Sequence, residues 1–180
     1  MRLPSLRGAI ELAVPLVCAG LAACEVIPTS PTASEAPNTP VSATSPAVGS
    51  AATISSVISL TNQARAASGA KPLTENASLD RAAAILCSEI AQTAVWSHTQ
   101  TGTAYPQMQD RANAVGYVWR ALGENLAGSN TPDAQHVMDM WMSSPDHRSN
   151  ILNVAYTEIG VAQLQAGSLV CSVQVFGSRS

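Results

Sequence analysis

Residues 25–52 form a stretch that cannot build a hydrophobic core, so it confines the folded part of the chain to the residues after it. The stretch is rich in Ser, Pro, Thr and Ala and holds few large aliphatic residues after Ile27. Such a composition buries too little apolar surface to offset the conformational entropy lost on folding, and its prolines favour an extended linker. We therefore expect a tether over 24–52 and one compact domain over 53–180.

Residues 1–23 have the pattern of an export signal. Two arginines give a basic start, residues 12–21 are largely apolar, and small residues come directly before Cys24. A Cys at this place resembles the bacterial lipobox, in which the thiol receives a diacylglycerol group. We expect 1–23 to be a lipoprotein signal peptide and Cys24 to carry the lipid, with an ordinary signal peptide as the alternative. The protein would then be exported and held by its lipid in the cell membrane or outer membrane of a bacterium.

Charge and composition exclude several classes of partner. Charged residues make up 12% of the chain, roughly half of the usual share, yet the sequence has no run of about 20 apolar residues that could span a membrane. The net charge of −3 and the lack of a Lys/Arg cluster argue against nucleic acid. The four cysteines include no CxxC pair, which argues against a zinc finger. The pattern shows no seam for an oligomer, so we expect a monomer.

The apolar pattern predicts helices in the first part of the domain and strands in the last part. Residues 79–93 have apolar side chains at helical spacing, and residues 168–177 alternate between apolar and polar. Thr131 followed by Pro132 predicts a helix start. The expected helices are 53–68, 79–93, 106–115, 132–141 and a short one from 144, and the expected strands are 117–119, 156–164 and 168–177. This order favours an α+β fold with helices packed on an antiparallel sheet.

Cys87 and Cys171 fall on apolar faces, the first of a predicted helix and the second of a predicted strand. Outside the cytoplasm a buried pair of thiols tends to be oxidised, so we expect a disulfide between them. A bond that closes about 85 residues stabilises a domain by several kcal/mol on the chain-entropy model. Two separate buried thiols that act as small hydrophobic side chains are the alternative.

Two histidines and two glutamates are the candidate site residues: His98, Glu124, His147 and Glu158. Their spacing alone defines no chemistry, because the sequence holds no HExxH, GxSxG, GxGxxG or P-loop motif. The third histidine, His136, lies beside the apolar stripe of its predicted helix, and we expect it to be solvated.

The order of the segments around these residues resembles the bacterial branch of the CAP superfamily, which groups cysteine-rich secretory, antigen 5 and pathogenesis-related proteins. The resemblance covers nearly all of 57–177, and its last motifs are the most specific. The matching segments are LTNQAR (60–65), SHT (97–99), DR (110–111), GENLA (123–127), SPDHR (144–148), NIL (150–152) and YTEIGV (156–161).

This resemblance implies a three-layer α-β-α sandwich with a central antiparallel sheet. It also implies a cleft lined by two His and acidic residues that can hold a divalent metal, and His98, Glu124 and His147 match the family's positions. Ser144 stands where animal members have a second Glu, so Glu158 is the alternative acid. Imidazole and carboxylate ligands suit Zn²⁺ or another divalent metal. A purely structural role for Glu124, as an acceptor for backbone N–H groups, stays open.

The resemblance favours non-enzymatic binding of a lipid, a polysaccharide or a protein at this cleft. One alternative is a metal-dependent hydrolase with Glu124 as general base, and another is a structural scaffold with a vestigial cleft. We expect Asn125 and Asn150 to connect loops. The tryptophans, at positions 96, 119 and 141, are expected in the core.

Overall fold

The computed structural model describes residues 49–180. The expected signal peptide, Cys24 and most of the expected tether lie outside this range. Helix α1 (Ala51–Ala67) begins two residues before the expected domain start at 53, because the Ser50 side chain caps it by accepting from the N–H of Thr53. No helix within 49–180 combines the length and the apolar character needed to cross a membrane.

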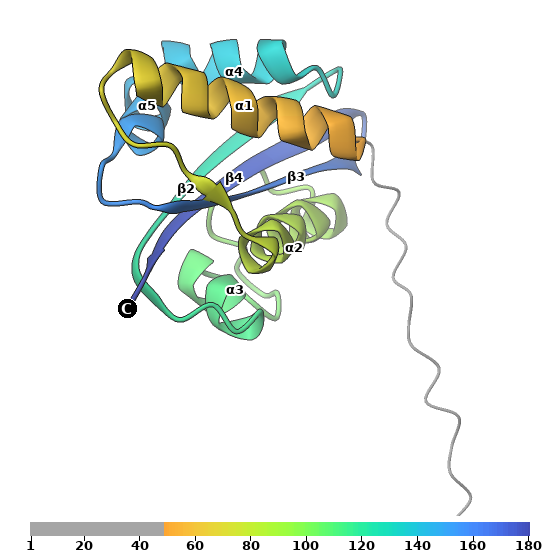
Figure 1. Ribbon diagram of the computed structural model, residues 1–180. Coiled ribbons are helices and arrows are strands. Elements are labelled where there is room, and N and C mark those ends of the chain that lie inside the picture. Colours follow the sequence, from red (N-terminus) through yellow and green to blue (C-terminus); the bar gives the residue numbers. More distant parts are fainter. Residues whose placement is uncertain (1–48) are drawn as a thin grey trace, which may run out of the picture. The chain divides into compact units, whose positions relative to one another are not determined.

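Four strands form one sheet in the order β1-β3-β4-β2 (Figure 1). Strands β3 (Glu158–Ala166) and β4 (Leu169–Arg179) form an antiparallel hairpin, and Gly167 in its turn has a φ of 63°. Strand β2 (Trp119–Ser129) pairs antiparallel with the other side of β4. These three strands confirm the expected antiparallel sheet. The short strand β1 (Thr74–Glu75) pairs parallel with β3 and has no counterpart among the expected elements.

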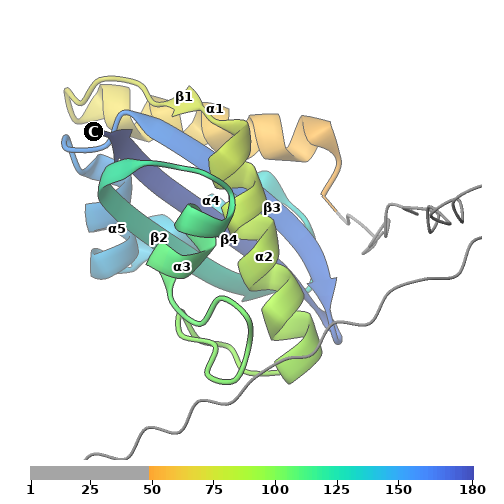
Figure 2. The same ribbon diagram turned by 90° about the horizontal axis from the view of Figure 1, so that it is seen from below.

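Helices cover both faces of the sheet, which confirms the expected three-layer sandwich (Figures 1 and 2). Helices α1, α4 (Ala134–Ser143) and α5 (Pro145–Leu152) lie on one face, and α2 (Ala77–Thr93) and α3 (Met108–Ala114) lie on the other. Side chains along β4 point alternately to the two faces of the sheet. Val173 and Val175 belong to the core beneath α2, whereas Phe176 belongs to the core beneath α1 and α4.

Two helices, α2 and α4, begin at other residues than expected, because side chains cap them at other positions. Asn76 accepts from the N–H groups of Ser78 and Leu79, so α2 begins earlier than residue 79. Asp133 accepts from the N–H of His136 and caps α4, so the expected cap at Thr131 is wrong. A carboxylate nearer the apolar stripe takes the capping position, and Pro132 precedes the helix instead of opening it.

Strand β2 is much longer than the expected strand 117–119, since it runs from Trp119 through the GEN segment to Ser129. The segment has few of the β-branched residues that usually mark strands, which explains the shortfall of the prediction. Its glycines leave room for neighbouring aromatic rings instead. A side chain at Gly123 would collide with the ring of Tyr156, and one at Gly128 would collide with Trp96.

A disulfide joins Cys87 of α2 to Cys171 of β4, with 5.6 Å between the two Cα atoms. This confirms the expected pairing and links the α2 layer to the central part of the sheet. Trp141 is fully buried, as expected. Trp119 is half-buried, and Trp96 lies at the surface, 39% exposed, so the core assignment of Trp96 is wrong.

Candidate functional site

Glu124 of β2 lies at the centre of the candidate site. Its side chain is only 4% exposed, and both of its carboxylate oxygens lie 3.0 Å from Nη2 of Arg111 in α3. The oxygen Oε1 also lies 2.9 Å from Nδ1 of His98. A buried carboxylate is stable only when its charge is matched and its lone pairs accept hydrogen bonds, and Arg111 and His98 supply both.

Arg111 also organises the loop that carries His98. Its guanidinium donates to the backbone oxygens of His98 at 3.0 Å and Tyr105 at 3.1 Å. Nη1 lies 3.6 Å from a second buried carboxylate, that of Glu89 in α2. One buried guanidinium therefore faces two buried carboxylates and holds the loop between α2 and α3 at two points, His98 and Tyr105.

The side chain of His98 is 51% exposed and borders an open hollow of about 280 Å³. Most of the residues that line this hollow have polar side chains. The lining consists of His98, Thr99, Gln107, Met108, Gln109 and Glu124. Because the side chains of Thr99, Gln107 and Gln109 hold hydroxyl and amide groups, the hollow offers both hydrogen-bond donors and acceptors to a bound molecule.

His147 lies at the third position of α5, after Ser144 and Pro145 as expected. Burial lowers the pKa of His147, the nearby His98 lowers it further, and Asp146 partly opposes the change. Burial and the charge of His98 thus both favour the neutral imidazole of His147.

Two asparagines hold α5 against the candidate site. The Asn125 amide donates to the backbone oxygen of His147 at 3.1 Å, and the Asn150 amide donates to that of Glu124 at 3.2 Å. The amide of Asn150 also reaches Oδ1 of Asn125 at 2.9 Å. The two residues therefore connect strand β2 to helix α5, not two loops as expected.

Glu158 lies outside the candidate site around Glu124. It is on β3, and β4 separates β3 from β2 in the sheet. Its carboxylate accepts from the Tyr117 hydroxyl at 2.6 Å, the Asn76 amide at 2.7 Å and Arg179 Nε at 3.2 Å. Burial alone would raise the pKa of Glu158, but these donors outweigh burial and lower it. The structure thus gives Glu158 a bracing role where β3 meets α2, and it does not join His98 and His147.

The bonds that Glu124 already makes bear on the expected zinc site. Within residues 49–180, no group of three or more His, Cys, Asp or Glu is placed to hold a metal ion. Zinc sites need three or four such ligands, but both oxygens of Glu124 already bind the fixed positive charge of Arg111. Zinc binding at His98 and His147 stays a prediction. His136 is exposed on α4, as expected.

Sequence reasoning missed the parts that Arg111 and Glu89 play. Arg111 is part of the DR motif, yet nothing in the sequence gives its partner, which lies 13 residues later on a strand. Glu89 carries a detectable signal. It is a charged residue directly before Ile90 on the predicted apolar face of 79–93, where an acid is buried only with a partner.

Comparison with known proteins finds a matching family model and a curated relative. The model of the family described as "CAP: Cysteine-rich secretory protein family" matches residues 58–176. The uncharacterized protein YkwD of Bacillus subtilis is 35% identical over 114 residues, which are 63% of this chain and 43% of YkwD. This chain therefore matches less than half of the length of that relative.

Solved structures share the fold at lower identity. An outer surface protein of Borrelia burgdorferi has a TM-score of 0.65 and 20% identity, over 72% of this chain and 95% of the Borrelia protein. An extracellular SCP-domain protein of Bacillus anthracis has a TM-score of 0.64 and 22% identity, over 72% of this chain and 41% of that protein. The family match covers most of the described domain and includes every segment that forms the candidate site. The chain therefore belongs to the cysteine-rich secretory protein (CAP) family.

Proposed function

We propose that this chain is an exported, lipid-anchored envelope protein whose CAP domain binds a polysaccharide at the His98 hollow without transforming it. The observation that carries the proposal is the state of Glu124. Its carboxylate is buried and hydrogen-bonded by Arg111 and His98, so it acts as a structural anchor for the hollow. What remains open to a ligand is a set of polar, exposed side chains.

The bonding of Glu124 counts against the hydrolase alternative. A general base needs a free lone pair within hydrogen-bond reach of water or substrate. Both oxygens of Glu124 accept from a guanidinium that is itself 1% exposed, and the carboxylate is 4% exposed, so water or substrate has little access to it. The lowered pKa of His147 favours a neutral imidazole that could accept a proton, but among the described residues no group of three or more His, Cys, Asp or Glu is placed to hold a metal ion.

The lining of the hollow favours a polysaccharide over a lipid. Thr99, Gln107 and Gln109 offer hydroxyl and amide groups that can pair with sugar hydroxyls as donors and as acceptors. An acyl chain would leave these groups unpaired, which costs free energy. Met108 is the one apolar side chain in the lining.

Export and anchoring are supported by two independent features. The first 23 residues have the basic, apolar and small-residue order of a secretory signal, and Cys24 follows it. Two structural relatives are described as an outer surface protein and as an extracellular protein. Lipidation at Cys24 would keep the binding domain next to the envelope.

Calorimetric titration of the purified protein with soluble oligosaccharides of glucose and of N-acetylglucosamine tests the proposal. We expect binding that falls about tenfold or more in His98→Ala and in Gln109→Ala. The control is His136→Ala, which removes an exposed histidine from α4 and should bind like the unchanged protein.

A parallel titration with Zn²⁺ separates binding from hydrolysis. Micromolar zinc binding that is lost in the His98→Ala/His147→Ala double variant and kept in His136→Ala would favour the hydrolase. Absence of any sugar binding, or equal binding by His98→Ala, would overturn the proposed function.

A further inference from the structure

One end of the domain carries almost no charge. Four segments form this end, which is called the tether end below: 49–53, 91–97, 129–133 and 165–170. The single charged residue in these segments is Asp133, whose carboxylate already caps α4. Removal of charged groups from water is costly unless they are paired, so the tether end is the part of the domain surface that leaves water most easily.

Contacts in the structure bring the four segments together. The N–H of Gly49 donates to the backbone oxygen of Gln163 at 3.3 Å, near the end of β3. Ser129, at the end of β2, pairs with Val170 near the start of β4. The end of α2 and the turn between β3 and β4 enclose a hollow of about 180 Å³, and most of the residues that line it are apolar. All four segments therefore lie at the same end of the sheet.

Val95 and Trp96 are exposed apolar residues at the tether end. Val95 is 51% exposed and Trp96 is 39% exposed. The Trp96 ring packs over Gly128, where a side chain would collide with it, and it lines the apolar hollow beside the turn. Tryptophan is enriched where membranes meet water, because its ring is apolar and its N–H can donate to headgroups. These two residues therefore suit a lipid surface.

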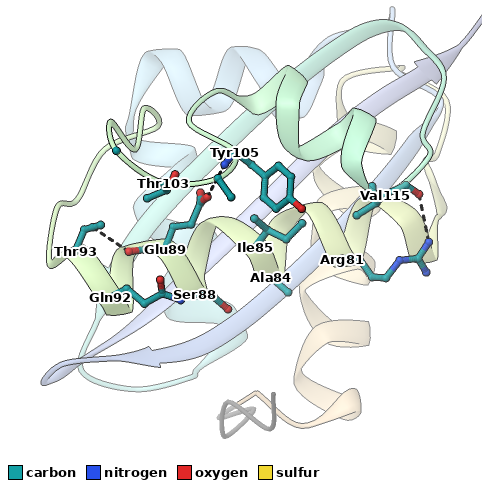
Figure 3. Close-up of a pocket in the computed structure, with 12 residues that line it drawn as sticks. Arg81, Ala84, Ile85, Ser88, Glu89, Gln92, Thr93, Thr103, Tyr105 and Val115 are labelled. Atoms are coloured by element: carbon teal, nitrogen blue, oxygen red, sulfur yellow. Dashed lines mark hydrogen bonds between the residues drawn. The ribbon is translucent and has the colours of Figure 1, made fainter. Parts of the chain in front are cut away.

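Other surfaces of the domain that hold apolar side chains also hold charges. Figure 3 shows Arg81 and Glu89 along the outer side of α2, whereas Gln92, nearer the end of the helix, is uncharged. Val118 is 70% exposed, but it lies at the opposite end of the sheet and two residues before the exposed Arg120. The combination of exposed apolar residues and few charges is thus found at the tether end.

The chain reaches the tether end from its expected lipid anchor. Gly49 is the first residue that the structure describes, and Cys24 lies 25 residues earlier. A flexible chain of that length spans on the order of 25 Å between its ends, which keeps the tether end close to the bilayer that holds the lipid. A short tether also gives its two ends a local concentration of about the millimolar range, so a weak apolar contact is enough.

We propose that the tether end docks on the lipid bilayer in which the Cys24 lipid is inserted, and this rests on the lipid anchor of the proposed function. The Trp96 ring and the Val95 side chain enter the interface between headgroups and acyl chains. The contact fixes which side of the domain faces the bilayer. The His98 hollow shares none of its lining residues with the tether end, so these residues take no part in the docking.

The experiment measures tryptophan fluorescence of the full-length, lipidated protein in phosphatidylcholine vesicles with brominated or with ordinary acyl chains. Bromine quenches an indole ring only at short range. We expect weaker emission in the brominated vesicles, because Trp96 lies in the interface. Trp119→Phe should keep this difference, and Trp96→Phe should abolish it. Equal emission of the unchanged protein in both kinds of vesicle would overturn the proposal, as would a difference that survives in Trp96→Phe.

A matched pair of substitutions tests whether the apolar contact holds the domain to the bilayer. Val95→Asp places a carboxylate at the tether end, which is costly to insert into lipid, and it should remove most of the difference between the two kinds of vesicle. Val118→Asp makes the same change at the opposite end and should leave the difference as it is. Melting temperatures verify that both variants fold. A difference of full size in Val95→Asp would overturn the proposal.

Flotation of the vesicles separates this outcome from that of the proposed function. The unchanged protein should float with the vesicles, and Cys24→Ala should float much less. Failure of the unchanged protein to float would overturn the anchor and the docking together, whereas flotation without quenching would overturn the docking alone. Val95→Asp should leave the binding of oligosaccharides at the His98 hollow unchanged.

Discussion

Nη1 of Arg65 in α1 donates to the carbonyl oxygen of Ile151 at the end of α5, 86 residues later, over 2.8 Å. The same side chain donates to the backbone oxygens of Asn153 at 2.9 Å and Lys71 at 2.7 Å, and it is 1% exposed. The last carbonyls of a helix lack partners within that helix. Arg65 supplies donors to the end of α5 and to the loop after α1 at once, and so joins two segments that are distant in sequence.

Replacement of Arg65 by Met should destabilise the domain by about 3 kcal/mol, because several buried carbonyl oxygens lose their donor. Arg65→Lys should recover little of this, since an ammonium cannot reproduce the planar fork of a guanidinium. Urea denaturation measures the free energy of unfolding. Arg120→Met, at an exposed position of β2, is the control and should stay within about 0.5 kcal/mol of the unchanged protein. A loss of that small size in Arg65→Met would contradict the prediction.

The bracing role of Glu158 predicts a pH dependence with a definite sign. Tyr117, Asn76 and Arg179 lower its pKa in the folded state, so its ionised form stabilises the fold above its ordinary pKa of 4.5. The stabilisation is lost as the pH falls through the lower, folded-state pKa. The difference in unfolding free energy between the unchanged protein and Glu158→Gln should therefore be present at pH 7 and shrink below about pH 4.5. A constant difference down to about pH 3 would show that charge plays no part.

His147 should titrate below the ordinary histidine pKa of 6.5, because burial and His98 both disfavour its protonated form. NMR titration of the imidazole signals measures this directly. In His98→Ala the pKa of His147 should rise toward its ordinary value, whereas in His136→Ala it should stay unchanged. A His147 pKa that does not respond to His98→Ala would mean that the two imidazoles do not interact.

A folded state with a lowered histidine pKa also loses stability as the pH falls below 6.5, because the unfolded chain then binds the proton more strongly. His147→Gln should remove this part of the pH dependence. The comparison needs only denaturation curves at about pH 7 and pH 5.

Loss of the disulfide should destabilise the domain by roughly 4 kcal/mol, as the chain-entropy relation predicts for a bond that closes a long loop. The Cys87→Ala/Cys171→Ala double variant should unfold at a lower urea concentration than the unchanged protein. Addition of a reductant should shift the unchanged protein toward the variant and leave the variant itself unaffected. Equal midpoints with and without reductant would contradict the prediction.

Cys24→Ala should move the protein from the membrane fraction to the soluble fraction of its host, since each buried methylene of a lipid chain contributes about 0.8 kcal/mol to membrane binding. Cys18→Ala is the matched control, because Cys18 lies within the expected signal peptide, residues 1–23, and its replacement should not change the distribution. Fractionation followed by immunoblotting makes the measurement. Retention of Cys24→Ala in the membrane fraction would rule out an anchor at this residue.

Hydrophobic periodicity alone predicts the helices and strands that have one clearly apolar face. The alternation of 168–177 predicts β4, and the helical spacing in 79–93 predicts most of α2 and the burial of Cys87. Periodicity does not predict strand β2, because its conformation depends on residues that come later in the chain. These are β4, which pairs with it, and Tyr156, whose ring packs on Gly123.

The candidate site is less visible in the sequence than the fold. Motifs identify His98, Glu124 and His147, and the structure brings them into one region. They do not show that Arg111 occupies both oxygens of Glu124, or that Glu158 pairs with Tyr117, which lies 41 residues earlier. Pairings of this kind depend on the sheet register and on the packing of loops, for which the sequence carries no periodic signal.

The position of β4 has a consequence for the order in which the domain assembles. Strand β4 is the last strand in sequence, yet it lies between β3 and β2, so neither neighbour has its full set of backbone hydrogen bonds until β4 arrives. The hairpin with β3 can form at once, whereas the pairing with β2 must close a loop of about 40 or more residues, which is slow. A chain that crosses a membrane from its amino end therefore cannot complete this sheet during passage, and folding must wait until β4 has crossed as well.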